Sequence, residues 1–310
     1  MIRALFSAPE AAWPQYHAAL ERAFDEAGLK IVLSRAIARP ADVDYIIYAP
    51  NDALTDFSPY TGCKAVMSLW AGVERIVANP TLTQPLCRMV DEGLRAGMVE
   101  YVTGHVLRYH LGLDRYTCAT PPGWDRQVPP LARDRTVGIL GLGALGSACA
   151  RTLAGFGFHV VGWSQTQKTL PGITCLTGPG GLTHLLAEAE IVVLILPATP
   201  GTENLMNADR LAAMRPGAAL INPGRGTLID DDALLAALDR GHLAHATLDV
   251  FRTEPLPENH PFRAHPRVTV TPHIAAETRP DSAARVIAEN IRRAETGEPM
   301  LYRVDRTRGY

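Results

Sequence analysis

Three short polar segments in the second half of the chain each follow an apolar run: NPGRGT at 222–227, LDVFRTEPLP at 248–257 and TPHIAA at 271–276. Arg225 in the first segment carries a planar guanidinium, which can hold two oxygen atoms at once. Histidine exchanges a proton near neutral pH, so His273 can act as a proton donor, and Glu254 can fix the tautomer of its imidazole. This set suits hydride transfer to a 2-oxo acid. In that chemistry Arg225 binds the carbonyl and carboxylate oxygens, Glu254 orients His273, and His273 protonates the developing alkoxide.

Taken singly, each of these residues has a plainer interpretation. Arg225 could anchor a glycine loop, Glu254 could be a turn residue beside two prolines, and any one histidine is more often structural than catalytic. The catalytic interpretation is favoured because all three segments follow strand-like runs. In open α/β sheets, ligands bind at the carboxyl ends of the strands.

A glycine motif, Gly141-Leu-Gly143-Ala-Leu-Gly146, follows the strand-like run TVGIL and opens a helical pattern. In dinucleotide-binding turns the first glycine allows the tight turn, the second lets the backbone approach the pyrophosphate, and the third lets helix pack on strand. The N–H groups at the helix start, at Ala144 and Leu145, favour the bound anion. A glycine-rich turn without a ligand is the alternative, since 26 glycines make chance matches common.

The next strand-like run, HVVGW, ends at Trp163 with no acidic residue after it. NAD sites usually carry Asp or Glu at this place, which accepts a bond from the ribose 2′-hydroxyl. Here Ser164, Gln165 and Lys168 follow, and a 2′-phosphate would meet no repelling carboxylate. We therefore expect a preference for NADP(H). NAD(H) stays possible if Gln165 bonds to the free ribose hydroxyls.

Short apolar runs alternate with helical patterns in two series along the 310 residues. The first series holds the strand-like runs RALFSAP, KIVLS, VDYIIYAP and CKAVMSLWAG, and the second holds six runs, from TVGIL at 136 to VTVTP at 268. This alternation predicts an α/β chain with two doubly wound parallel sheets. Helices are expected at 98–111 and 279–295. Because the last helix has no strand partner in the second series, we predict a substrate domain of 1–97 plus 275–310 and a nucleotide domain of 98–274.

Composition narrows the class of protein. The apolar share of 47% and the charged share of 20% fit a folded globular chain, and the net charge of −2 gives no global attraction for nucleic acid or a membrane surface. The five cysteines are widely spaced and form no C-x-x-C pair, which argues against disulfides and a metal site. The start lacks the apolar segment of a signal peptide. We expect a cytoplasmic protein without metal, membrane or nucleic-acid partners.

At this point the chain resembles the D-isomer-specific 2-hydroxyacid dehydrogenase family over nearly its whole length. The resemblance rests on the glycine motif, on NPGRGTLID, LDVFRTEPLP and TPHIAA, and on SLWAGVERIV at 68–77, all in family order. Within the family, GWSQTQK, LPATPGTENLMN and the ending GEPMLYRVDRTRGY are similar to a bacterial subgroup of glyoxylate/hydroxypyruvate reductases. The resemblance implies a Rossmann dinucleotide-binding domain inserted in a flavodoxin-like substrate domain. It also implies a cytoplasmic homodimer that reduces these small 2-oxo acids with NADPH.

Further site residues follow from the resemblance. A turn at Ala71, Gly72 and Val73 would present N–H groups to the substrate carboxylate. Trp70 stands where glycine is common in the subgroup, and it would either wall the substrate pocket or pack against the core. Arginine is common in place of Gln165, so the choice of cofactor could be relaxed. The other implied cofactor contacts are Leu196, Pro197, Thr202, Pro223, Gly224 and Asp249, with Ala275, Arg225 and His273.

Two other functions stay open at this point. One is an NAD-dependent member of the same family that acts on phosphoglycerate, formate or phosphite, against which the acid-free segment after Trp163 counts. The other is a nucleotide-sensing binding protein of the same fold, which can keep the catalytic set without turnover. A loop around Trp124 is expected to reach a partner subunit.

Overall fold

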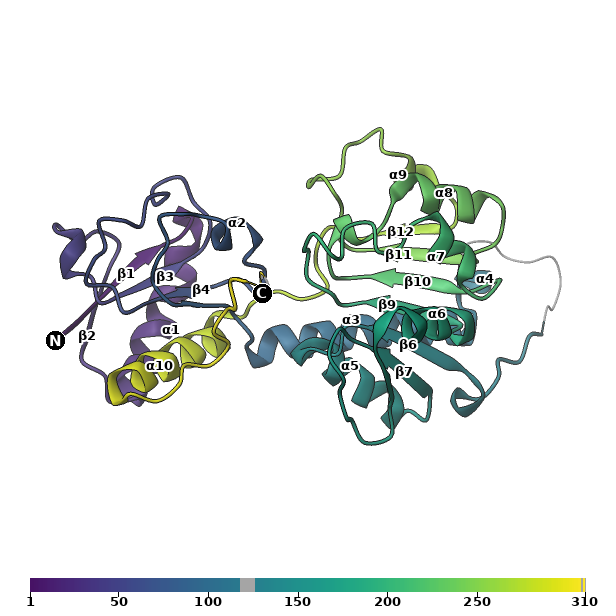
Figure 1. Cartoon of the computed structure of the whole chain (residues 1–310), viewed down its shortest axis with the longest axis horizontal. Coiled ribbons are helices and arrows are strands. Elements are labelled where there is room, and N and C mark those ends of the chain that lie inside the picture. The colour runs from purple at the N-terminus through teal and green to yellow at the C-terminus, as the bar shows by residue number, and fades with distance from the viewer. Residues whose placement is uncertain (118–125, 308, 310) are drawn as a thin grey trace. The chain divides into compact units, whose positions relative to one another are not determined.

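A computed structural model of the chain describes residues 1–117, 126–307 and 309. The chain divides into two compact units, Met1–Leu94 with Glu277–Tyr310 (unit 1) and Arg95–Ala276 (unit 2). The chain passes from unit 1 to unit 2 after residue 94, where the prediction has 97. It returns to unit 1 after residue 276, where the prediction has 274. In Figure 1 the purple N-terminal elements and the yellow C-terminal helix belong to the same unit. The predictions for Cys118 and Trp124 fall outside the described residues.

Unit 1 is built on a five-stranded parallel sheet with the strand order β2-β1-β3-β4-β5. This is the flavodoxin-like order, so the predicted fold class is confirmed for this unit. The sequence predicts four of these strands. It misses β5, because two residues are too few to show a periodic pattern. The strands are β1 (Ile2–Ser7), β2 (Ile31–Ser34), β3 (Tyr45–Tyr48), β4 (Ala65–Ser68) and β5 (Leu86–Cys87).

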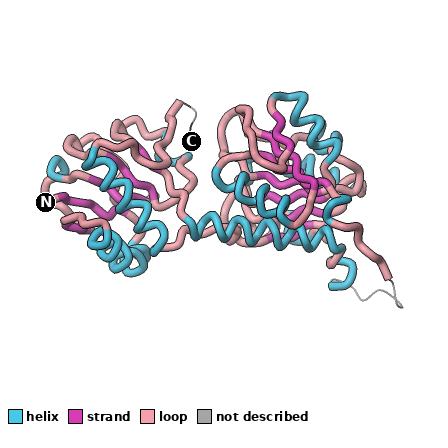
Figure 2. The backbone as a smooth tube through the Cα atoms, turned by 90° about the horizontal axis from the view of Figure 1, so that it is seen from below, coloured by secondary structure: helices cyan, strands magenta, loops and turns pink. Residues whose placement is uncertain are grey.

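Helices α1 (Trp13–Glu26) and α10 (Pro280–Thr296) lie side by side on one face of this sheet (Figures 1 and 2). Alternate strand residues point to opposite faces, so Phe6 and Ile47 pack with these helices while Ile46 packs on the other face. The short helix α2 (Glu74–Val77) belongs to that other face. The last helix of the chain therefore completes the core of the N-terminal unit.

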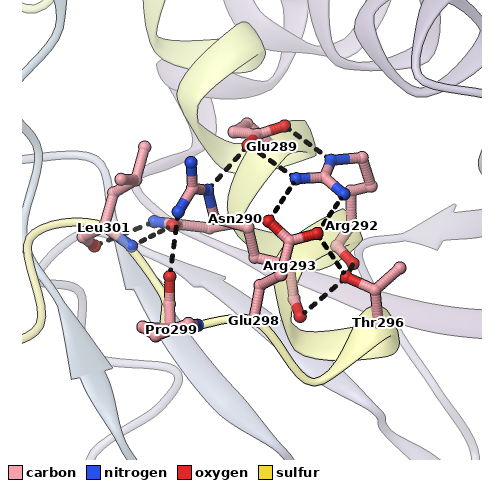
Figure 3. Close-up of polar contacts among 8 residues, drawn as sticks. All are labelled: Glu289, Asn290, Arg292, Arg293, Thr296, Glu298, Pro299 and Leu301. Carbon is pink, nitrogen blue, oxygen red and sulfur yellow. Dashed lines mark hydrogen bonds and ion pairs between the residues drawn. The ribbon is translucent and has the colours of Figure 1, made fainter.

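The segment after α10 turns back and runs beside β5. Gly297 ends the helix with a left-handed φ of 75°. Arg292 then joins the helix to the turn, since its guanidinium donates to Glu289 at 2.8 Å and to Glu298 at 2.6 Å (Figure 3). Asn290 is buried and exchanges two hydrogen bonds with the main chain of Leu301. These contacts fix the start of the C-terminal segment.

Unit 2 holds a seven-stranded parallel sheet with the order β12-β11-β10-β9-β6-β7-β8. Counted from β6, its first six strands follow the Rossmann order 3-2-1-4-5-6, so the fold class is confirmed here too. The expectation of six strands is wrong by one. The strand that the prediction misses is β8, which has three residues and lies at the sheet edge beside β7. Three residues are too few to show a periodic pattern. The strands are β6 (Thr136–Leu140), β7 (His159–Trp163), β8 (Thr174–Leu176), β9 (Ile191–Leu194), β10 (Ala219–Asn222), β11 (His245–Leu248) and β12 (Val268–Val270).

Helices cover both faces of this sheet. On one face, α3 (Glu92–Leu111) and α5 (Ala144–Gly155) bury Val102 and Val106 of α3 against strand residues such as Ile139. On the other face lie α6 (Gly178–Glu188), α7 (Ala208–Ala213) and α8 (Asp231–Asp239). Two single-turn helices, α4 (Asp114–Thr117) and α9 (Pro261–Ala264), complete the unit. Helix α3 begins six residues before the predicted 98–111, and the main-chain N–H of Leu94 donates to Asp91 at this end.

Two findings bear on the expected class of protein. None of the helices in the described ranges is long and apolar enough to cross a bilayer. The four cysteines that the structure describes carry free thiols.

We predict that the Arg292 contacts make unfolding sensitive to acid. Arg292 lowers the pKa of Glu289 and of Glu298 to about 2, from a usual value of 4.5. A depressed carboxyl pKa adds stability that is fully present above the unfolded pKa and is lost as pH falls through the folded pKa. The free energy of unfolding in urea should therefore fall between about pH 5 and about pH 2, and less steeply in a Glu289→Gln/Glu298→Gln variant.

The exposed Glu258→Gln is a matched control that should keep the wild-type slope. Equal slopes for the wild-type chain and the double variant would contradict the prediction.

Candidate active site

The three polar segments leave the same edge of the unit 2 sheet. Strands β10, β11 and β12 are neighbours, and their register aligns Asn222 with Leu248 and Leu248 with Val270. These are the last residues of the three strands, so the loops that carry Arg225, Glu254 and His273 begin level with one another. Parallel pairing thus gathers residues that are up to about fifty positions apart in sequence.

Glu254 and His273 form a hydrogen-bonded pair. A carboxylate oxygen, Oε2, accepts from Nδ1 of His273 at 2.7 Å, and the other, Oε1, accepts from the main-chain N–H of Phe251 at 2.9 Å. The His273 and Glu254 side chains are 50% and 35% exposed, so the imidazole is the more open of the two. Because Nδ1 is bonded to the carboxylate, Nε2 is the ring nitrogen that can exchange a proton with a ligand. The predicted pairing of these two residues is present in the structure.

His273 sits in an unusual backbone conformation, with a φ of 56°. Left-handed φ is costly for a residue with a side chain, so surrounding contacts must hold it. The main-chain N–H of His273 donates to the carbonyl oxygen of Asp249 at 2.9 Å and to that of Thr271 at 3.1 Å. The main chain just after β11 and the main chain just after β12 thus together fix the backbone from which the imidazole projects.

Asp249 supports the same loop through its side chain. It is fully buried, and its carboxylate accepts from Thr271 Oγ1 at 2.6 Å, from the Ile274 N–H at 2.9 Å and from the Ala275 N–H at 2.9 Å. Asp249 and Ala275 are predicted cofactor contacts, and those contacts stay predictions. In the structure, both residues hold the loop around His273, a role that the sequence analysis missed.

Arg225 is held between two glycines that cannot be replaced, because the end of β9 and the loop after β11 leave no room for a side chain there. A Cβ at Gly224 would lie 2.8 Å from the Leu194 carbonyl oxygen, and one at Gly226 would lie 2.0 Å from the Phe251 carbonyl carbon. The buried Asn222 closes the loop, since its Nδ2 donates to the Arg225 carbonyl oxygen at 2.8 Å. Asn222 is a support that the sequence analysis did not single out, although it begins the NPGRGT segment.

The glycine motif forms a tight turn between β6 and α5. Gly141 has a φ of 108°, and a Cβ there would lie 2.1 Å from the Ile195 carbonyl oxygen. Gly146, on the first turn of α5, approaches the Gly141 carbonyl oxygen so closely that a Cβ would lie 1.7 Å from it. By contrast, apart from its two chain neighbours, no described residue has a heavy atom within 4 Å of the place that a Cβ would take at Gly143, so the turn is open there. Ala144 and Leu145 begin α5 at this turn.

The acid-free segment after β7 is partly built into the fold. The indole N–H of Trp163 donates to the Gly178 carbonyl oxygen at 2.9 Å, and the buried Ser164 donates its hydroxyl to the Thr166 carbonyl oxygen at 2.7 Å. Gln165 and Lys168 are exposed. Of the four predicted contacts, these last two therefore present their side chains most openly.

The remaining predicted cofactor positions lie in the loops after β9 and β10. Thr202 uses its hydroxyl within its own turn, donating to the Pro197 carbonyl oxygen at 2.7 Å and accepting from the Thr199 N–H at 2.8 Å. Leu196 is half-buried and Pro223 is buried. Their contacts with a cofactor stay predictions.

The predicted carboxylate turn lies in unit 1, after β4. Ser68 fixes its start, because its hydroxyl donates to the Trp70 carbonyl oxygen at 3.0 Å and accepts from the Trp70 N–H at 3.1 Å. Trp70 itself is 45% exposed and is outside the hydrophobic clusters of this unit's described residues. No hydrogen bond assigned among the described residues is donated by the N–H of Ala71, Gly72 or Val73. The substrate-binding role of these residues stays a prediction.

Comparisons with known proteins agree with the fold and with the sequence motifs. Residues 110–275 match the family described as "D-isomer specific 2-hydroxyacid dehydrogenase, NAD binding domain". A protein of Serratia proteamaculans named "Glyoxylate/hydroxypyruvate reductase A" is 41% identical over 280 residues, which cover 88% of each chain. One with the same name from Yersinia enterocolitica is 38% identical over 284 residues, 89% of this chain and 90% of that one.

Solved structures are similar over almost the full length. A D-isomer specific 2-hydroxyacid dehydrogenase from Xanthobacter autotrophicus Py2, in complex with NADPH and MES, is 41% identical with a TM-score of 0.91, covering 99% of both chains. An NADPH-dependent glyoxylate/hydroxypyruvate reductase from Sinorhizobium meliloti, in complex with NADP and sulfate, is 32% identical with a TM-score of 0.86, covering 100% of both chains.

Proposed function

The chain belongs to the D-isomer-specific 2-hydroxyacid dehydrogenase family, and from this premise we propose that it reduces glyoxylate to glycolate and hydroxypyruvate to glycerate with NADPH. The observation that carries the proposal is the His273–Glu254 pair, which extends from the same sheet edge as the Arg225 loop. The names of the similar proteins from Serratia, Yersinia and Sinorhizobium support the substrate class.

The protein's own residues divide the work. Arg225 binds oxygens of the 2-oxo acid with its planar fork, and the N–H groups of Ala71, Gly72 and Val73 bind the substrate carboxylate. His273 donates a proton from Nε2 to the carbonyl oxygen as that oxygen becomes an alkoxide. The bond from Nδ1 to Glu254 keeps the ring oriented, with Nε2 toward the substrate, before and after the transfer.

The dinucleotide site fits NADPH. The tight turn at Gly141, the open approach at Gly143 and the start of α5 suit a pyrophosphate, and no carboxylate follows Trp163 in the segment up to Lys168. When bound, NADPH supplies the hydride that adds to C2 of the oxo acid. The residues that we expect to hold it are Gly141, Gly143, Ala144, Leu145, Gly146, Trp163, Ser164, Gln165, Lys168, Leu196, Pro197, Thr202, Pro223, Gly224 and Ala275.

Replacing His273 should remove the proton donor. We expect His273→Ala to lower kcat for glyoxylate by roughly 10²- to 10⁴-fold, as for other enzymes that lose a general acid. His184→Ala is the matched control, because His184 is also exposed and contacts a glutamate, Glu188, at 3.4 Å in α6. The control should turn over like the wild-type chain. Near-wild-type kcat in His273→Ala would refute the assignment, and no turnover of any 2-oxo acid by the wild-type chain would favour a nucleotide sensor.

The choice of cofactor is tested at Gln165. Gln165→Glu keeps the shape of the side chain and adds a negative charge at an exposed position beside the proposed 2′-phosphate site. At an effective dielectric near 20, like charges about 5 Å apart repel by roughly 3 kcal/mol, so the KM for NADPH should rise about tenfold or more. The KM for NADH, which lacks the 2′-phosphate, is the internal control and should change little. A lower KM for NADH than for NADPH in the wild-type chain would contradict the proposed preference.

We also propose that the protein works as a homodimer in the cytoplasm. Large apolar side chains are exposed near the end of α3 and beyond it, namely Leu111, Leu113, Val128 and Leu131. We propose that these exposed apolar side chains are buried against a second copy of the chain. Sedimentation equilibrium should give twice the 33.5 kDa mass of one chain, and a mass of one chain would exclude the dimer.

A further inference from the structure

We infer that Tyr101 and Thr271 are positioning residues for His273, because a hydrogen-bond relay from α3 through Thr271 to Asp249 holds the loop that carries the imidazole. The inference rests on the proposed function for its kinetic readout. None of the motifs in the sequence pointed to Tyr101, and it lies on a helix outside the three polar segments.

The direction of the relay follows from its chemistry. Tyr101 Oη and Thr271 Oγ1 are 2.7 Å apart, and Thr271 Oγ1 donates to Asp249 Oδ1 at 2.6 Å. A threonine hydroxyl has one proton, which is committed to the carboxylate, so its oxygen must accept from the tyrosine. Burial raises the pKa of Tyr101, so the phenol keeps the proton that it donates. The relay therefore runs from Tyr101 to Thr271 to Asp249.

At its far end the relay orders the catalytic loop. The Asp249 carboxylate accepts from the N–H groups of Ile274 and Ala275, directly after His273, and the Asp249 carbonyl accepts from the N–H of His273 itself. These bonds clamp both sides of a residue held at a φ of 56°. A shift of the carboxylate would release the loop and turn the imidazole away from its working direction.

Helix α3 offers a second tyrosine that makes the same kind of bond elsewhere. Tyr101, His105 and Tyr109 are spaced four residues apart, so they form one stripe on the helix. Tyr109 Oη lies 2.5 Å from Thr247 Oγ1, inside strand β11 rather than beyond its end. Both tyrosines contribute a partly buried phenol and a threonine partner, but of the two only the Tyr101 bond leads to the Asp249 carboxylate through its threonine. Comparing the loss of the hydroxyl at Tyr101 with its loss at Tyr109 therefore distinguishes an effect on the His273 loop from a general effect on the packing of α3.

The kinetic experiment compares four variants with NADPH and glyoxylate. Thr271→Val removes the hydroxyl but keeps the branched shape. We expect its kcat to fall by about tenfold with KM within about twofold, because the loop is displaced while the groups that bind substrate stay in place. Thr271→Ser keeps a hydroxyl and should restore kcat. Tyr101→Phe should lower kcat by about threefold, and Tyr109→Phe should leave it unchanged. Wild-type kcat in Thr271→Val, or an equal loss in Tyr101→Phe and Tyr109→Phe, would overturn the inference.

A second measurement does not depend on turnover. Hydrogen exchange of the peptide that contains Ile274 and Ala275 should be faster in Thr271→Val and in Tyr101→Phe, and unchanged in Tyr109→Phe. Unchanged exchange in Thr271→Val would overturn the relay whatever the kinetics. If the wild-type chain reduced no 2-oxo acid while the exchange pattern appeared, the proposed function would fail and the positioning of the loop would stand.

Discussion

Parallel pairing of β10, β11 and β12 is the constraint on which the active site depends. The register brings the last residues of the three strands level, so three loops that are distant in sequence start from neighbouring points. No single loop could hold an arginine, a glutamate and a histidine in a useful arrangement without ordering many residues at an entropic cost. The sheet supplies that order, since its strands are buried beneath helices on both faces.

The loops themselves are shaped by close contacts between backbones. Gly226 lets the Arg225 loop touch the chain at Phe251, and the side chain of Glu254 bonds to the main chain at that same residue. Asp249 ties the third loop to the end of β11. Each proposed catalytic side chain therefore lies on a loop that contacts the adjacent loop or strand end. The costly left-handed backbone at His273 is tolerated because several of these bonds converge on it.

Much of this arrangement could be predicted from the sequence, because long apolar runs and glycine motifs carry strong local signals. The two parallel sheets and the polar segments at strand ends belong to this group. The strands β5 and β8 could not, since two or three residues show no period. Nor could the work of Asn222, Asp249 and Tyr101, which depends on contacts across the fold. Tyr101 meets Thr271 over 170 positions of sequence, and no local pattern encodes such a distance.

The C-terminal segment also has a consequence for the behaviour of the protein in a crowded solution. Strand β5 is one of the two edges of the unit 1 sheet, and an uncovered edge presents unpaired N–H and C=O groups that can pair with another chain. Here Val304 donates to Leu86 and Arg88 donates to Tyr302, so the chain caps its own edge in the antiparallel sense. The Arg292 contacts at the turn keep this cap in place. The segment after α10 thus occupies backbone groups at the β5 edge that would otherwise be open to pairing with another chain.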